Sequence, residues 1–127
     1  MKTVVMVLVT LAAASLLLTA CKKSISVECA TKMRDVKADN MNEGATFTVK
    51  CPAACTGGIV YGTDTYTTDS SVCATAVHAG VIPADKGGAV VVKVVKGLES
   101  YAGSARNGIT SSEWKTSWGP TAFTVSK

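Results

Sequence analysis

The sequence is poor in the groups that enzymes use for acid–base and nucleophilic chemistry. It contains one histidine, His78, and its carboxylates form no paired motif. No serine, histidine and aspartate are ordered so that a base would lie beside a nucleophile, and such groups must come within hydrogen-bond reach to act. The composition therefore favours a protein without catalytic activity, and no motif for a cofactor or a metal is present. An enzyme is the less favoured alternative.

Dense basic runs are also absent. Of the 13 Lys and Arg residues, Lys2 lies in an N-terminal segment that we expect to be removed, which leaves 12 basic residues against 9 acidic ones. These charges are spread along the chain, whereas nucleic-acid-binding domains gather basic side chains in a patch or stripe. We therefore expect no nucleic-acid partner.

The first 20 residues differ from the rest of the chain. Lys2 is followed by an apolar run over residues 4–18, and Thr19 and Ala20 then precede Cys21. A basic start, an apolar stretch and small residues before a cleavage point are typical of a secretory signal, and a cysteine directly after that point resembles the lipobox of bacterial lipoproteins. We predict that residues 1–20 are a lipoprotein signal peptide and that Cys21 is lipidated.

This prediction places the mature protein on the periplasmic or cell-surface side of a bacterial membrane. Lys22 after the cysteine favours the outer membrane if the source has two membranes. An uncleaved anchor is the alternative, because residues 3–20 are nearly long enough to span a bilayer. Lys22 and Lys23 would then hold the domain in the cytosol, which the cysteine content argues against.

Five cysteines are present, and an odd number in an exported protein needs an explanation. Lipidation of Cys21 leaves four, enough for two disulfides, which persist only outside the reducing cytosol. Three pairings are possible for Cys29, Cys51, Cys55 and Cys73. A bridge from Cys51 to Cys55 would close a very small loop around a proline, so links from these two residues to Cys29 and Cys73 are favoured. A zinc site is disfavoured, since the spacing is not one that zinc sites use.

The mature chain is expected to form one small domain rich in β-strands. We interpret residues 21–28 as a polar, lipidated tether, residues 29–127 as the domain, and residues 30–44 as irregular, with at most a short strand or a turn of helix. Alternation or β-branched residues predict strands at residues 45–50, 59–61, 89–96 and 122–125. Asn107-Gly108 indicates a tight hairpin turn.

One helix is predicted over residues 71–79. Residues 67–71 offer several side chains for an N-cap, and Gly80 stands where a helix would end in a left-handed residue. Five residues turn a helix by about 500°, so Cys73 and His78 point about 140° apart and cannot share a ligand or a proton. We therefore expect His78 to be structural, bonded to a free carbonyl or favoured as a cation by the helix dipole.

Residues 66–82, which read YTTDSSVCATAVHAGVI, resemble the signature of the LCCL domain. The similarity extends to Cys51-Pro52 with Cys55, to Gly87-Gly88 before a valine-rich strand, and to Asn107-Gly108. It covers nearly all of residues 29–127. The chain is therefore identified as similar to LCCL domain proteins, in the form of a bacterial lipoprotein that carries a single such domain.

The resemblance implies an α+β fold in which a central short helix is wrapped by irregular antiparallel β-sheets. It implies that the cysteines pair first with second and third with fourth, giving Cys29–Cys51 and Cys55–Cys73. Ser71, His78 and Gly80 would belong to the structural helix motif. Thr75 departs from the family, which usually has alanine there, and its hydroxyl needs a partner or a path to water.

Family members are extracellular modules, and some have been linked to lipopolysaccharide recognition or innate defence. The resemblance thus implies a binding module at a bacterial envelope that recognises a glycan, a lipopolysaccharide-like lipid headgroup or an envelope protein. A structural or assembly role in the envelope is the alternative.

The candidate ligand surface is the segment 111–119, which contains both tryptophans. Trp114 and Trp118 would share a face if this segment were helical, and exposed tryptophans suit sugars and protein partners. Packing of at least one of them against the sheet is the alternative, because large aromatic side chains dominate small cores.

Overall fold

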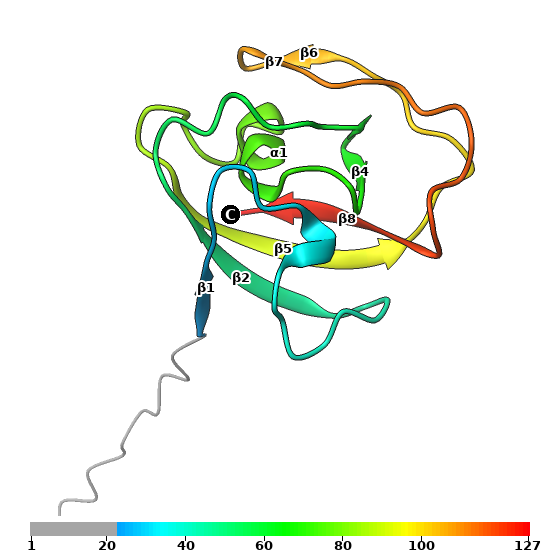
Figure 1. The fold of residues 1–127 in the computed structure, drawn as a ribbon, viewed down its shortest axis with the longest axis horizontal. Coiled ribbons are helices and arrows are strands. Elements are labelled where there is room, and N and C mark those ends of the chain that lie inside the picture. Colours follow the sequence, from blue (N-terminus) through cyan, green and yellow to red (C-terminus); the bar gives the residue numbers. More distant parts are fainter. Residues whose placement is uncertain (1–22) are drawn as a thin grey trace, which may run out of the picture.

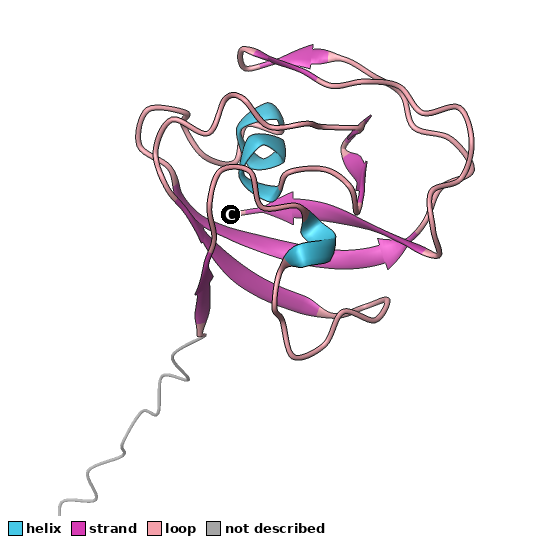
Figure 2. Cartoon of the chain, in the orientation of Figure 1, coloured by secondary structure: helices cyan, strands magenta, loops and turns pink. Residues whose placement is uncertain are grey.

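The computed structural model describes residues 23–127, so the predicted signal peptide and Cys21 lie outside the described residues. A six-stranded sheet in the order β1-β2-β5-β8-β4-β3 and a separate ribbon of β6 and β7 surround one α-helix (Figures 1 and 2). The strands are β1 (Ser24–Ser26), β2 (Thr46–Cys51), β3 (Gly62–Thr63), β4 (Thr65–Thr67), β5 (Gly88–Lys96), β6 (Ala105–Arg106), β7 (Ile109–Thr110) and β8 (Thr121–Ser126). The helices are the 3-10 turn η1 (Met33–Asp35) and α1 (Val72–His78). This is the predicted α+β class.

The centre of the sheet is the valine-rich strand β5. Val90, Val92 and Val94 alternate toward the core and are at most 1% exposed, as a strand with one buried face requires. β5 pairs antiparallel with β2 on one side and β8 on the other, and Phe123 of β8 lies opposite Val94. The strands predicted from alternation at 45–50, 89–96 and 122–125 are therefore confirmed to within a residue or two.

The predicted helix is confirmed as α1, and every one of its seven residues is buried. Gly80 has φ +76°. Its amide donates to the carbonyl of Val77, and the amide of Val81 donates to the carbonyl of Ala76. These are the two hydrogen bonds that define a Schellman C-cap. At the other end the Val72 amide donates to the Thr31 carbonyl. The helix is therefore held at its N-terminus by a distant loop as well as by its own sequence.

The tether is shorter than the sequence suggested. Residues 24–26 form β1, which pairs in parallel with β2 at the edge of the sheet. Ile25 is half-buried and packs against the core beside Val49, while its serine neighbours point outward. A single apolar residue between two serines gave too weak an alternation to predict a strand.

The strand expected at 59–61 is wrong in its position. Ile59 is 51% exposed, and the ladder begins only at Gly62, where β3 turns sharply into β4 through Asp64 at φ +66°. The apolar residues 59–61 predict a strand too early in the chain. The position of the Gly62–Thr67 hairpin is set by the pairing of β4 with β8, and a contact between such distant segments leaves no local pattern in the sequence.

The disulfides correct the pairing that the family resemblance implied. The structure links Cys29 to Cys55 and Cys51 to Cys73. Cys51 is buried at the end of β2 and meets Cys73 in the first turn of α1, with a Cα–Cα distance of 5.5 Å. The chain turns after Pro52, which brings Cys55 to within 4.8 Å of Cys29, Cα to Cα. Cross-links from Cys51 and Cys55 to the two outer cysteines, favoured by loop size, are confirmed.

Residues 30–44 are mostly irregular, as expected, but their first part is firmly attached. The amides of Met33 and Arg34 donate to the carbonyls of Ser70 and Thr68, and Lys32 bridges to Ser71. The side chain of Met33 is fully buried. This segment therefore runs along the chain that leads into α1. Across residues 23–127, no helix has the length and apolar character that crossing a bilayer requires.

Candidate functional site

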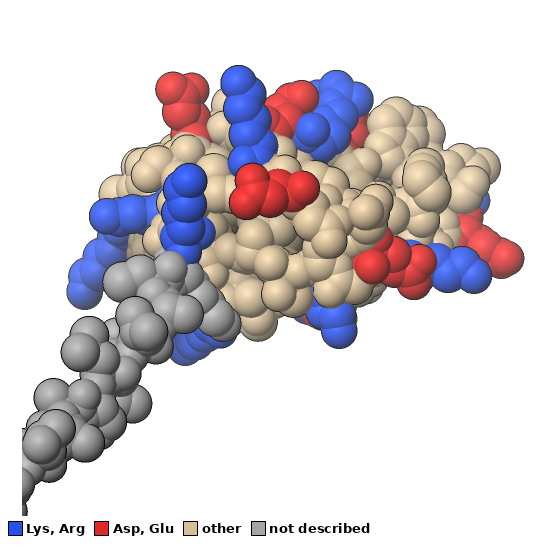
Figure 3. Space-filling model, turned by 90° about the horizontal axis from the view of Figure 1, so that it is seen from below, with Lys and Arg blue, Asp and Glu red and all other residues tan. Residues whose placement is uncertain are grey.

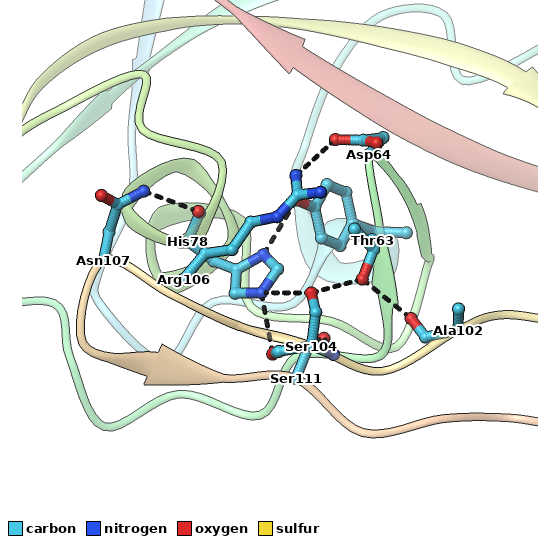
Figure 4. Close-up of polar contacts among 9 residues, drawn as sticks. Thr63, Asp64, His78, Ala102, Ser104, Arg106, Asn107 and Ser111 are labelled. Carbon is cyan, nitrogen blue, oxygen red and sulfur yellow. Dashed lines mark hydrogen bonds and ion pairs between the residues drawn. The ribbon is translucent and has the colours of Figure 1, made fainter.

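His78 lies at the centre of a buried polar cluster (Figure 4). Its ring is fully buried, with Nδ1 3.0 Å from the Tyr66 hydroxyl and Nε2 3.1 Å from the Ser104 carbonyl oxygen. The Ser104 hydroxyl lies 3.2 Å from Nε2 and 2.6 Å from the hydroxyl of Thr63. The cluster joins α1 to β4 and to the segment that precedes β6.

These contacts orient the imidazole. A carbonyl oxygen only accepts hydrogen bonds, so Nε2 carries a hydrogen, and the geometry matches the tautomer in which Nδ1 accepts from the Tyr66 hydroxyl. Because Nε2 carries a hydrogen, it has no lone pair with which to take a proton from Ser104, although the two side chains are within hydrogen-bond distance. Burial also raises the pKa of the Tyr66 phenol above its ordinary value, which keeps this donor protonated.

The other two residues of the predicted helix motif lie at the ends of α1. Ser71 is the N-cap residue by backbone geometry, but its hydroxyl caps no amide in the part of the chain that is described. Gly80 supplies the left-handed C-cap. The free carbonyl of His78 accepts a hydrogen bond of 2.9 Å from the Asn107 side chain, whose own φ of +53° places it in the β6–β7 turn. The predicted hairpin turn thus also closes the end of the helix.

The two tryptophans lie together on the surface, beside Tyr61. The ring centroids of Trp114 and Trp118 are 5.2 Å apart, and those of Tyr61 and Trp114 are 5.9 Å apart, both pairs edge to face. Trp114 is 36% exposed, and Trp118 and Tyr61 are half-buried. With Thr67 and Asp69 these rings line a hollow of about 90 Å³, which we call the aromatic hollow.

The helical arrangement considered for residues 111–119 is wrong. Trp114 is extended and exchanges backbone hydrogen bonds of 2.7 and 2.9 Å with Tyr101. Ser112 forms a parallel bridge with Tyr61, and its amide donates to the Val60 carbonyl. These bridges fix the backbone beneath the rings. Trp118 then reaches Trp114 because the chain bends between them, and the two rings meet without helical spacing.

The charge beside the aromatic hollow is set by Asp69. Its carboxylate lies 2.9 Å from Lys32 Nζ and 3.2 Å from Arg34 Nη1. Asp69 is the one charged residue among those that line the hollow, and two cations face its carboxylate. These ion pairs offset its negative charge beside the rings.

Sequence reasoning missed Tyr61 and the ion pairs of Asp69. Tyr61 falls in the strand expected at residues 59–61, and Asp69 falls among the candidate N-cap side chains of residues 67–71. Tyr61 and Trp114 are separated by more than 50 residues in the chain, and no local pattern indicates that they meet. The one available signal was composition, since few aromatic residues are present and two of them lie within five positions.

Sequence similarity to known proteins covers most of the chain. The model of the LCCL domain family matches residues 27–120. Human vitrin is 47% identical over 79 residues, which are 61% of this chain and 11% of vitrin. Clotting factor C of Tachypleus tridentatus is 41% identical over 92 residues, 71% of this chain and 9% of that protein. Human cochlin is 36% identical over 108 residues, 81% of this chain and 18% of cochlin.

The chain thus spans less than a fifth of the length of these curated relatives. The family match covers most of the described residues, including the helix, both disulfides and the aromatic hollow. This chain belongs to the LCCL domain family.

Proposed function

We propose that this chain is a non-catalytic binding module that recognises a glycan or the sugar headgroup of a glycolipid, such as a lipopolysaccharide, through the aromatic hollow. A lipid on Cys21 would hold it on the outer side of a bacterial membrane. The observation that carries the proposal is the exposed Trp114 ring, set edge to face between Trp118 and Tyr61 over a small hollow.

The chemistry of the hollow suits a sugar. Aromatic faces pack against the C–H faces of a pyranose, and the tryptophan indole N–H and tyrosine hydroxyl supply polar contacts at the same place. Thr67 and Asp69 add a hydroxyl and a carboxylate to the lining. Backbone bridges hold the rings in place before a ligand arrives, which lowers the entropy cost of binding.

The arrangement around His78 supports the absence of catalysis. The only histidine is fully buried, and both ring nitrogens are engaged. We infer that it joins α1 to β4 and to the segment before β6, and that Ser71 and Gly80 serve the same helix as its end residues.

The test is a binding screen of the oxidised protein against lipopolysaccharides, glycans and envelope extracts, followed by titration of any ligand found. Trp114→Ala is expected to weaken binding by at least tenfold, as removal of a central aromatic contact does. Ile59→Ala is the matched control, because Ile59 is also an exposed large apolar residue but does not line the hollow. Equal affinity of both variants and the parent would contradict the proposal.

A further inference from the structure

We propose that a second surface docks this domain on an anionic membrane, with the aromatic hollow directed away from the bilayer. The surface consists of Lys23, Lys37, Lys50 and Lys93, and we call it the N-terminal basic face. The inference rests on the proposed lipid anchor for its starting geometry, and its charge argument stands on the described residues alone.

The four lysines lie around β1 and the two strands next to it in the sheet. Lys23 and Lys37 line one hollow together with Thr46 and Phe47. A neighbouring hollow is lined by Lys23, Thr46 and Thr48. The other two lysines follow from strand register, since Lys93 pairs with Thr46, and Lys50 pairs with Ser26 of β1. Figure 3 shows Lys and Arg side chains gathered around the point where the described chain begins.

The face has an unbalanced charge. All four lysines are exposed, and none forms an ion pair with another residue of the described region, whereas Lys32, Arg34, Arg106 and Lys115 do. Asp39 is the one carboxylate that lines the two hollows. The outward positions of β2 and β5 carry threonine, alanine, valine and lysine and no acidic residue. The surface therefore complements a negatively charged plane.

The short distance in sequence between Cys21 and β1 favours a membrane as the partner of this face. β1 begins three residues after Cys21, so a lipid on Cys21 would hold the start of the sheet within about 10 Å of the headgroups. At that distance exposed lysines lie within about a Debye length of an anionic surface. The segment between β7 and β8, which carries the aromatic hollow, lies on the side of the domain away from β1 (Figure 1).

The experiment uses the full mature protein on vesicles of phosphatidylcholine alone and on vesicles that also contain phosphatidylglycerol. Lysine labelling with a water-soluble acylating reagent, read by mass spectrometry, measures which side chains the bilayer covers. We expect Lys23, Lys37, Lys50 and Lys93 to be protected on the anionic vesicles only, and high salt to remove the protection because it screens exposed charges.

Paired variants give the quantitative test. Lys50→Gln with Lys93→Gln is expected to lower the docking equilibrium about thirtyfold, since each lysine near an anionic surface contributes about a factor of five. The control is Lys96→Gln with Lys115→Gln, two exposed lysines, one paired in register with Thr121 and one beside Trp114, and it should change nothing. Both pairs alter exposed side chains only.

The outcomes separate the two proposals. Flotation with neutral vesicles reports the lipid anchor. Flotation without any difference in lysine labelling between the two vesicles would overturn the basic face and leave the anchor standing. Salt-sensitive flotation with anionic vesicles alone would support the face and overturn the anchor. No flotation with either would overturn both.

Discussion

At the scale of single residues, the polar side chains of α1 have the greatest need for hydrogen-bond partners inside the protein. All seven residues of the helix are buried, so each polar atom among them must find a partner inside the protein. His78 meets this demand at both ring nitrogens. Thr75 does not, because its hydroxyl oxygen is buried with no hydrogen-bond partner among residues 23–127. Threonine at this position thus has a structural cost.

Thr75→Val should therefore stabilise the domain. Valine keeps the branched shape and removes an unsatisfied hydroxyl, whose burial costs about 1–3 kcal/mol. Thr67→Val is the matched control, because Thr67 is equally buried but its hydroxyl lies 3.1 Å from that of Ser70. Chemical denaturation should show a higher free energy of unfolding for the first variant and a lower one for the second. A loss of stability in Thr75→Val would show that its hydroxyl has a partner.

The buried Tyr66 phenol should make the stability of the fold depend on pH in the alkaline range. Burial raises its pKa in the folded state above the ordinary value of about 10. The folded protein thus holds this proton more tightly than the unfolded chain does. The resulting stability is complete below the unfolded pKa and is lost as pH rises through the folded pKa.

Thermal unfolding between about pH 8 and 11 tests this dependence. The parent should lose stability more steeply above about pH 10 than Tyr66→Phe does, although the variant is less stable at neutral pH because His78 Nδ1 loses its donor. Parallel curves for the two proteins would contradict the assignment.

At the scale of elements, α1 is too short to be stable alone, since isolated helices of this length are marginal in water. Its stability comes from segments that cover it closely. Gly58 is the tightest of these contacts. A Cβ atom there would lie 2.6 Å from Ser71 Cβ and 2.9 Å from Ala74 Cβ, and both neighbours are buried.

Gly58→Ala is expected to destabilise the domain by about 1–3 kcal/mol, the usual cost of overpacking a core. Gly57→Ala provides the control, because a Cβ at Gly57 meets nothing within 4 Å. Urea unfolding of the two variants separates close packing from the general effect of replacing glycine. Equal urea midpoints for the two variants would mean that the loop containing Gly58 can move away from α1 without loss of stability.

Local pattern explains which elements could be predicted. β5 and α1 have strong periodicity and end signals of their own, and both were predicted within two residues of the observed bounds. β1, β3 and β4 are two or three residues long, so their existence depends on partners far away in the chain. The aromatic hollow has the same origin: the sequence predicts the two tryptophans as one candidate surface, whereas Tyr61, which lines the hollow with them, comes from a distant loop.

At the scale of the whole molecule, two disulfides connect the strands and loops that surround α1 to the helix and to one another. Cys51–Cys73 joins the sheet to α1, and Cys29–Cys55 joins the chain after β1 to the loop after β2. Each closes a loop of more than 20 residues, which stabilises the fold by about 3 kcal/mol through the entropy of the unfolded chain. Sequence could not decide between the pairings, because it does not show which sulfur atoms meet.

Our central proposal is that the domain is exported and oxidised, that its strands and loops enclose one buried helix, and that a lipid on Cys21 holds it at a membrane. Peptide mapping by mass spectrometry, under non-reducing conditions and on protein isolated from membranes of its source, tests it most directly. We predict linked peptides for Cys29–Cys55 and Cys51–Cys73 and an acylated N-terminal Cys21. Four free thiols and an unmodified Cys21 would contradict the account.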